Sequence, residues 1–238
     1  MYRLLRLAYS ILDKILALAL LIVLLIGIYF VYDTAYVFYH ASADRVAYYR
    51  PGSDSEELES SQRPFTEDYV AWLSLDDTGI EHPVMQGQTN SEYLNKDPYG
   101  DYSLSGSIFL DSRNAKDFSD SYCLLYGHHM SGGLMFGALD RYFDESYFLS
   151  HRNGKLILND CEYRIDIFAV LMTDASVEAL FEPSGSEAVL ELASQQSTFY
   201  LEPANNHILA LSTCRDAGSS ARTVVLATLT EEHEVTEA

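Results

Sequence analysis

An uncharged apolar run near the N-terminus, Ile15–Tyr32, constrains this chain more than any other feature. As a helix that rises about 1.5 Å per residue, its 18 residues span roughly 27 Å, close to the hydrocarbon thickness of a bilayer. A cleaved signal peptide is the alternative, because Ala41 and Ala43 form an A-x-A-like pair. The run is longer than a usual signal core, however, and that pair lies well beyond its end. We therefore expect a retained transmembrane signal-anchor over residues 15–32.

Basic residues precede this run. Arg3, Arg6 and Lys14 are offset only by Asp13, and such an excess of positive charge stays on the cytoplasmic side of a membrane. The sequence therefore predicts a single-pass protein of the cell membrane. Its residues 1–14 are expected in the cytoplasm, and everything after the anchor is expected to be extracellular.

The segment that follows the anchor, residues 33–63, is interpreted as a juxtamembrane region and linker. Its last part, Pro51–Arg63, is polar and acidic and contains no aromatic or β-branched residue. The composition changes at Pro64, so we predict one folded domain over residues 64–230, followed by a short tail over 231–238.

Charge and cysteine content exclude several classes of protein. The chain has 15 Lys and Arg against 35 Asp and Glu, a formal net charge of −20, which repels phosphate backbones. Nucleic acid is therefore not expected as a partner. The 3 cysteines cannot all pair within one chain and none lies in a CxxC motif, so neither a disulfide scaffold nor a zinc knuckle is indicated.

From Pro64 onward, short apolar runs alternate with turn residues at intervals of about ten, which is typical of an all-β barrel or sandwich. Helices are expected as exceptions, at Thr66–Leu73, Met135–Tyr142 and Glu187–Gln196. The predicted strands are seven: Ile80–Gln86, Gly106–Leu110, Tyr122–Tyr126, Lys155–Asn159, Glu162–Met172, Ile208–Ser212 and Thr223–Leu229.

Residues that carry chemistry follow two of these strands. The motif YGHHM, Tyr126–Met130, puts histidines directly after one apolar strand, and LSTC ends another at Cys214. A free cysteine is most often a buried small hydrophobic residue, and Cys123 and Cys161 are interpreted in that way. Cys214 differs from them because it stands at the end of a strand, eight residues before Arg222.

A thiol attacks a carbonyl carbon only as its thiolate, and the reference pKa of cysteine is near 8.5. A neighbouring histidine can take up the thiol proton or deliver a proton to a leaving amine. Arginine stays charged, so it can bind substrate or stabilise a tetrahedral oxyanion but cannot act as a base.

The ordered set of motifs resembles the sortases, the cell-wall transpeptidases of Gram-positive bacteria, and class B in particular. The resemblance runs from about Pro64 to Leu229 and is carried by WLSLDDTGIEHPVMQG, EYLN, GSIFLDSRN, YGHHM, the following LMF, LSTC and the downstream arginine. It implies an all-β-dominated fold, a closed eight-stranded barrel with peripheral helices, one of them the predicted helix Glu187–Gln196 between strands six and seven. It also implies His128, Cys214 and Arg222 as the catalytic residues.

Some positions depart from the family pattern or carry weaker expectations. Ala210 stands where the signature before the cysteine usually begins with Thr, and His129 falls where the class often has Asn, so His129 is left out of the catalytic set. Ser212 and Thr213 are candidate substrate contacts, with a turn-forming role as the alternative for Ser212. Asp216 could orient His128, although a residue in such a loop is normally part of a turn. The tripeptide Asp97–Tyr99 resembles the lid of class C pilin sortases, but its position favours a turn.

The resemblance implies an acyl transfer. Cys214 would cleave a C-terminal sorting motif of an exported protein through a thioacyl intermediate, and an amine of peptidoglycan or a pilin lysine would resolve it. Neither a metal nor an organic cofactor is expected. The alternatives are a hydrolytic cysteine peptidase, in which water resolves the thioester, and a non-catalytic anchored binding module.

Overall fold

The computed structural model describes residues 2–41, 49–51, 65–214 and 220–232. The chain divides into two compact units, Met1–Tyr39 and His40–Ala238, and each is described by itself. The linker Pro51–Arg63 lies almost entirely outside the described residues, as do Ala43 and Asp216.

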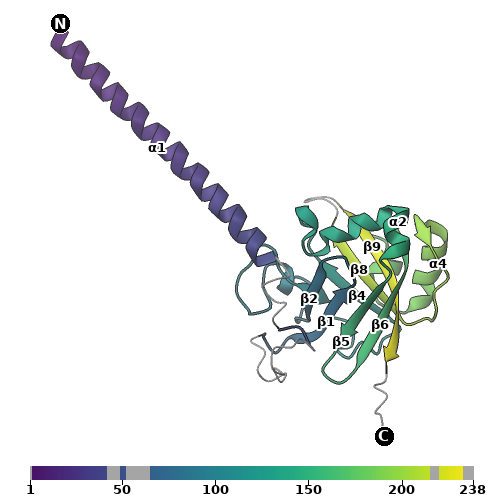
Figure 1. The fold of residues 1–238 in the computed structure, drawn as a ribbon. Helices are drawn as coiled ribbons and strands as arrows, with labels where there is room; N and C mark the ends of the chain where they lie inside the picture. The colour runs from purple at the N-terminus through teal and green to yellow at the C-terminus, as the bar shows by residue number, and fades with distance from the viewer. Residues whose placement is uncertain (1, 42–48, 52–64, 215–219, 233–238) are drawn as a thin grey trace. The chain divides into compact units, whose positions relative to one another are not determined.

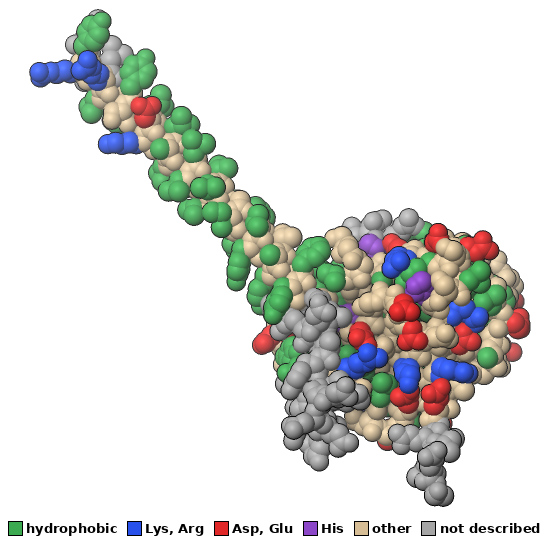
Figure 2. All heavy atoms as spheres, in the orientation of Figure 1, with side chains coloured by type: hydrophobic (Ala, Val, Ile, Leu, Met, Phe, Trp, Pro, Cys, Tyr) green, Lys and Arg blue, Asp and Glu red, His purple; other side chains and the backbone are tan. Residues whose placement is uncertain are grey.

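The first unit consists of most of one long helix, α1 (Tyr2–Ala41). Its stretch Tyr9–Tyr39 is long and apolar enough to cross a membrane, and it contains the predicted span. Hydrophobic side chains cover its length, and Lys and Arg lie toward its N-terminal end (Figure 2). A helix that exposes apolar side chains all round is typical of a segment surrounded by lipid.

The second unit is a closed barrel (Figure 1). Eight strands follow one another in the order β5, β1, β2, β3, β4, β8, β9, β6, and β6 pairs again with β5. A short strand, β7 (Phe199–Tyr200), adds to the edge of β6. The eight-stranded closed barrel that the resemblance implied is therefore confirmed. Its strands are β1 (Tyr69–Leu75), β2 (Ile80–Met85), β3 (Ile108–Leu110), β4 (Tyr122–Gly127), β5 (Asn153–Ile157), β6 (Glu162–Asp174), β8 (Ile208–Cys214) and β9 (Ala221–Glu232).

One predicted helix is wrong: most of Thr66–Leu73 belongs to strand β1. The residues at its start, interpreted as a helix N-terminus, form a turn in which the backbone N–H of Tyr69 donates to the carbonyl of Thr66 at 3.1 Å. The strand is buried on both faces between β2 and β5. Such a continuous apolar run has no period that distinguishes a strand from a buried helix. This segment supplies the eighth strand of the barrel.

The other two predicted helices are present. Met135–Tyr142 corresponds to the 3-10 helix η6 (Phe136–Phe143), and Glu187–Gln196 to α4 (Ser186–Gln196). As expected, α4 lies between the sixth and seventh barrel strands in chain order, β6 and β8. The remaining short helices are η4 (Glu92–Leu94), η5 (Ser131–Gly133), α2 (Glu145–Ser150) and α3 (Glu178–Phe181).

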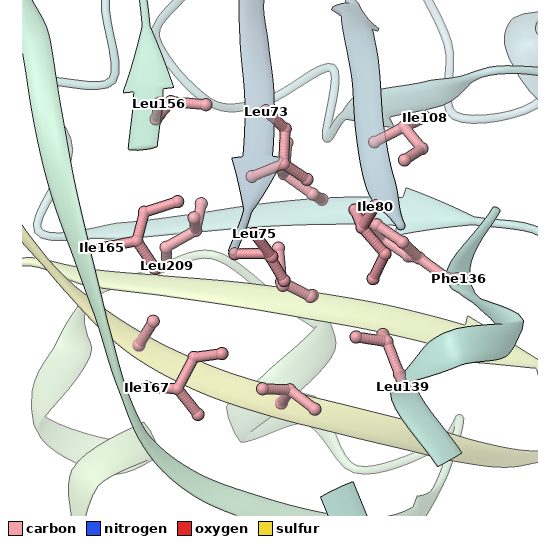
Figure 3. Close-up of a cluster of buried hydrophobic side chains, with 14 of the residues drawn as sticks. Leu73, Leu75, Ile80, Ile108, Phe136, Leu139, Leu156, Ile165, Ile167 and Leu209 are labelled. Atoms are coloured by element: carbon pink, nitrogen blue, oxygen red, sulfur yellow. The ribbon is translucent and has the colours of Figure 1, made fainter. Parts of the chain in front are cut away.

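Two hydrophobic clusters sit on opposite faces of the barrel wall. The first fills the interior, where Phe136 and Leu139 of η6 point toward Leu75 and Ile80 (Figure 3). The second packs the outer face of β4, β8 and β9 against α3 and α4. Alternate residues of a strand point to opposite faces, so β4, β8 and β9 each contribute to both clusters. Cys123 is buried in the interior cluster, whereas Cys161 is partly exposed in the connection between β5 and β6.

Candidate active site

Three neighbouring strands bring the predicted catalytic positions to one rim of the barrel. β4 runs parallel to β8, with Gly127 opposite Thr213, so His128 follows β4 next to the register position of Cys214. β9 runs antiparallel to β8, and Cys214 pairs with Arg222 as the terminal pair of that ladder. Residues separated by more than 80 positions in the sequence thus meet through backbone pairing.

Positions 214 and 222 also share the outer face of the barrel wall. On β8, Ile208 and Ala210 belong to the outer cluster, and positions 212 and 214 continue that alternation. On β9, Val224 belongs to the same cluster, and position 222 is the next in its series. The side chain of Cys214 itself lies outside the described residues.

His128 is partly exposed and is held from two sides. Its ring Nε2 lies 2.7 Å from the carbonyl oxygen of Leu94 in η4. A carbonyl oxygen only accepts hydrogen bonds, so Nε2 carries a proton in this arrangement. The backbone carbonyl of His128 accepts from the N–H of Phe136 at 3.1 Å. The contact with Leu94 therefore orients the imidazole, and the contact with Phe136 fixes the backbone that carries it.

Arg222 brings positive charge to this rim. Asp174, the last residue of β6, has its pKa lowered to about 2, first by hydrogen bonds from Ser176 and Ser220 and to a smaller extent by the charge of Arg222. Burial raises the pKa of the Tyr126 hydroxyl, and Arg222 acts against that shift. The field of the guanidinium therefore reaches both β6 and β4 across the outer face.

Ser212 and Thr213 are both buried, with 1% of each exposed. Ser212 follows the outer-face alternation, and among the described residues its Oγ has no hydrogen-bond partner. Thr213 instead continues the interior series of Leu209 and Leu211 at the mouth of the barrel. The tripeptide Asp97–Tyr99 forms a turn, as predicted, in which Asp97 Oδ1 accepts from the N–H of Tyr99 at 3.0 Å.

Sequence reasoning missed a polar network behind the rim. The buried carboxylate of Asp111 accepts from Arg113 Nε at 2.8 Å, from Asn90 Nδ2 at 2.8 Å and from the Tyr126 hydroxyl at 3.1 Å. Burial alone would raise the pKa of Asp111, but the hydrogen bonds from Arg113 and Asn90 outweigh it and lower the pKa. Arg113 also donates to the carbonyl of Phe181 at 2.7 Å, so the network joins β4 to α3. In the sequence, the only indication of this network was a pair of charged residues directly after an apolar strand.

Among the described residues, no three His, Cys, Asp or Glu side chains are grouped so that they could hold a metal ion. A cavity of about 410 Å³ opens at the β1–β2 hairpin, where Arg50 and Glu81 form an ion pair of 2.7 Å. The described side chains that line it include none of His128, Ser212, Thr213 and Arg222.

Comparison with known proteins gives one consistent family. The model of the sortase domain matches residues 73–230. The sortase B of Listeria monocytogenes is 32% identical over 170 residues, which is 68% of this chain and 69% of that protein.

Solved structures agree with this match. The crystal structure of a Streptococcus pyogenes class B sortase involved in pilus biogenesis superimposes with a TM-score of 0.66 at 36% identity, covering 76% of this chain and 100% of that one. A Staphylococcus aureus sortase B in complex with substrate gives a TM-score of 0.66 at 27% identity, covering 74% of this chain and 85% of that one. With the matching fold, motifs and family model, this chain belongs to the sortase family, in its class B, and is a cysteine transpeptidase.

Proposed function

We propose that Cys214 attacks the Thr carbonyl of a C-terminal sorting motif in an exported protein and passes the acyl group to an amine of the cell wall or of a pilin. The observation that carries this proposal is the β4–β8–β9 register, in which positions 128, 214 and 222 meet at one rim. A thiolate, an imidazole and a guanidinium together supply a nucleophile, a proton carrier and a fixed positive charge.

The first half-reaction forms a thioester. The Cys214 thiol gives its proton to the His128 imidazole, and its sulfur bonds to the carbonyl carbon. The carbonyl oxygen becomes an oxyanion that Arg222 stabilises or helps to position. When this intermediate collapses, the C–N bond breaks and the leaving amine takes a proton from the His128 imidazolium. The acyl group then remains on sulfur.

The second half-reaction frees the cysteine and regenerates the thiolate and the imidazolium. The acceptor amine attacks the thioester carbon, His128 takes up the proton released from nitrogen, and the sulfur leaves as thiolate. An amide bond replaces the amide bond that was cut, so the energy of the substrate peptide bond is retained. Water in place of the amine would give hydrolysis, the outcome of a peptidase.

Substrate contacts are proposed at Ser212 and Thr213, next to the nucleophile. The Ser212 hydroxyl is buried and has no hydrogen-bond partner within the described part of the chain, which supports its role, because a polar substrate group could satisfy it. Thr213 adjoins Cys214 directly and is proposed as a contact from the barrel mouth.

The anchor suits this reaction. We propose that residues 15–32 span the cell membrane with residues 1–14 in the cytoplasm, and that residues 33–63 link the span to an extracellular catalytic domain over 64–230. The long apolar helix supports the span, and Arg3, Arg6 and Lys14 support the orientation. Substrates that are themselves held in the membrane would meet the enzyme at a raised effective concentration.

The proposal is tested with the full chain in detergent micelles. A library of quenched fluorescent peptides with a central Thr is supplied with triglycine, which offers an α-amine, or with Nα-acetyl-lysine amide, which offers an ε-amine. Mass spectrometry of the products is expected to show a peptide joined to one amine, and Cys214→Ala to form none. Hydrolysis alone would favour a peptidase, and no turnover of any peptide would contradict the proposal.

A further inference from the structure

A single carboxylate connects the strands that lie on either side of β8 at the candidate active site. Asp140, in η6, accepts a hydrogen bond from His129 Nε2 at 2.9 Å through Oδ2. Its other oxygen, Oδ1, accepts from the Thr223 hydroxyl at 2.8 Å. Each oxygen therefore holds a different part of the barrel rim.

The two partners of Asp140 are the direct sequence neighbours of proposed catalytic residues. His129 follows His128 after the end of β4, and Thr223 follows Arg222 at the start of β9. β8, which ends at Cys214, lies between these two strands. The Asp140 carboxylate thus bridges the two chain segments that carry the imidazole and the guanidinium, one on each side of β8.

The same helix holds His128 directly. Phe136, the first residue of η6, donates its N–H to the carbonyl of His128, and Met135, just before it, forms an isolated β-bridge with His129. Phe136 is itself fixed in the interior cluster. Asp140 therefore projects from an element that is already anchored both to the core and to the backbone of the catalytic histidine.

Burial distinguishes the two hydrogen bonds. Thr223 is fully buried, so the loss of its acceptor would leave a hydroxyl without a partner inside the barrel mouth. The side chains of His129 and Asp140 are 28% and 37% exposed, so this contact costs less desolvation. A charged acceptor strengthens both hydrogen bonds relative to a neutral one.

We propose that Asp140 is a positioning residue for the transpeptidase reaction, which fixes the spacing of His128 and Arg222 by bonding to the residue that follows each of them. This inference rests on the proposed roles of these two residues. The loss of the Asp140 carboxylate slows the steps after substrate binding, because proton transfer and oxyanion stabilisation depend on geometry within the transition state.

The test compares four variants of the full chain in detergent. Asp140→Ala removes both hydrogen bonds, and Thr223→Val removes one of them with little change in shape. Asp140→Asn is the conservative variant, because its amide keeps an oxygen for Thr223. Asp166→Ala is the matched control. The side chain of Asp166, on β6, is 35% exposed, similar to that of Asp140, and it pairs with Arg152 at 2.6 Å.

With peptide and amine substrates, Asp140→Ala is expected to lower kcat about tenfold and Thr223→Val about threefold, with KM within about twofold of the native value. Asp140→Asn recovers part of kcat, and Asp166→Ala leaves kcat and KM within about twofold. A second readout needs no peptide: the rate of Cys214 alkylation by iodoacetamide at pH 7, followed by mass spectrometry, falls several-fold in Asp140→Ala and not in Asp166→Ala.

The result that overturns the inference is a folded Asp140→Ala variant with native kcat and native Cys214 alkylation, or an equal loss in Asp140→Ala and Asp166→Ala. If Asp140→Ala fails to fold, the isosteric Thr223→Val variant decides by the same criteria. If the native chain turns over no peptide, the proposed function fails, and the alkylation rates alone decide whether Asp140 positions the rim.

Discussion

The Nε2 atom of His128 donates a hydrogen bond to the carbonyl oxygen of Leu94 over 2.7 Å. Gly106 is the residue that makes room for this carbonyl, because a Cβ at position 106 would lie 2.5 Å from the Leu94 oxygen. Gly106→Ala is therefore expected to displace the acceptor of His128 and to lower kcat about tenfold, because a small misplacement of a catalytic group is costly. Steady-state kinetics with the peptide library measures this effect.

Gly79→Ala is the matched control for that variant. Both glycines have a positive φ, +58° at Gly106 and +79° at Gly79, so both substitutions introduce backbone strain. A Cβ at Gly79, however, meets nothing within 4 Å. The two variants should lose similar stability from strain, and native kcat in a folded Gly106→Ala would show that the Leu94 carbonyl does not position the imidazole.

Gly137 is required by the packing of the η5–η6 segment. A Cβ there would lie 2.0 Å from the carbonyl oxygen of Met130, closer than any contact allows. Gly137→Ala is expected to lower the free energy of unfolding by about 3 kcal/mol, a typical cost of severe overpacking. Urea denaturation measures it, with Gly133→Ala for comparison: its Cβ would meet only Ala138 at 4.0 Å, so its loss comes from the backbone strain of a φ of +76° alone and is expected to be about 1 kcal/mol. A similar small loss in both variants would contradict the close contact.

His82 makes stability depend on pH. It is buried in β2, and burial lowers its pKa from 6.5 to about 4. As the pH falls, the unfolded chain therefore binds a proton at position 82 near pH 6.5, whereas the folded chain binds it only near pH 4. The stability that the neutral, buried His82 contributes is fully present above pH 6.5 and is lost as the pH falls toward 4. The difference between the pKa of His82 in the unfolded and the folded chain corresponds to about 3 kcal/mol of unfolding free energy.

The measurement is urea unfolding at several pH values between 4 and 7. In His82→Leu, the decline in unfolding free energy over this range should be smaller by about that amount, because no proton is taken up at position 82 on unfolding. An unchanged pH dependence in the variant would show that His82 is not the group that titrates.

The three cysteines are expected to behave differently. Burial raises the pKa of Cys123 to about 12, which suppresses its thiolate, and it also raises that of the partly exposed Cys161. Cys123→Ala should cost about 1 to 2 kcal/mol of stability through the lost buried sulfur, and kcat should stay native. Cys214→Ala should abolish turnover without a loss of stability. Circular dichroism and peptide turnover separate these effects, and inactivity of folded Cys123→Ala would contradict them.

The sequence predicted the strands with alternating or short apolar runs, and the residue types that carry the chemistry. It could not distinguish β1 from a helix, because Ala71, Trp72 and Leu73 are buried on both faces and leave no period. The turn at Thr66 also used residues that favour helix N-termini, so the local signal pointed to the wrong structure.

Long-range pairing accounts for the rest of what sequence reasoning missed. Nothing in YGHHM indicates that β4 lies beside β8, or that Leu94 supplies an acceptor for His128. The link from Asp140 to Thr223 joins residues 83 positions apart, and either residue alone looks like an ordinary polar side chain. Only the closed strand order brings these groups together.

In the proposed reaction, the thiol at position 214 becomes covalently acylated with the help of His128 and Arg222. Intact and peptide-level mass spectrometry of the full chain, after rapid mixing with a substrate peptide in the absence of amine, detects this acylation. We expect an acyl adduct on Cys214 that disappears when triglycine is added, and that fails to accumulate in His128→Gln or Arg222→Ala. Turnover without any adduct on Cys214, or native adduct formation in both variants, would contradict it.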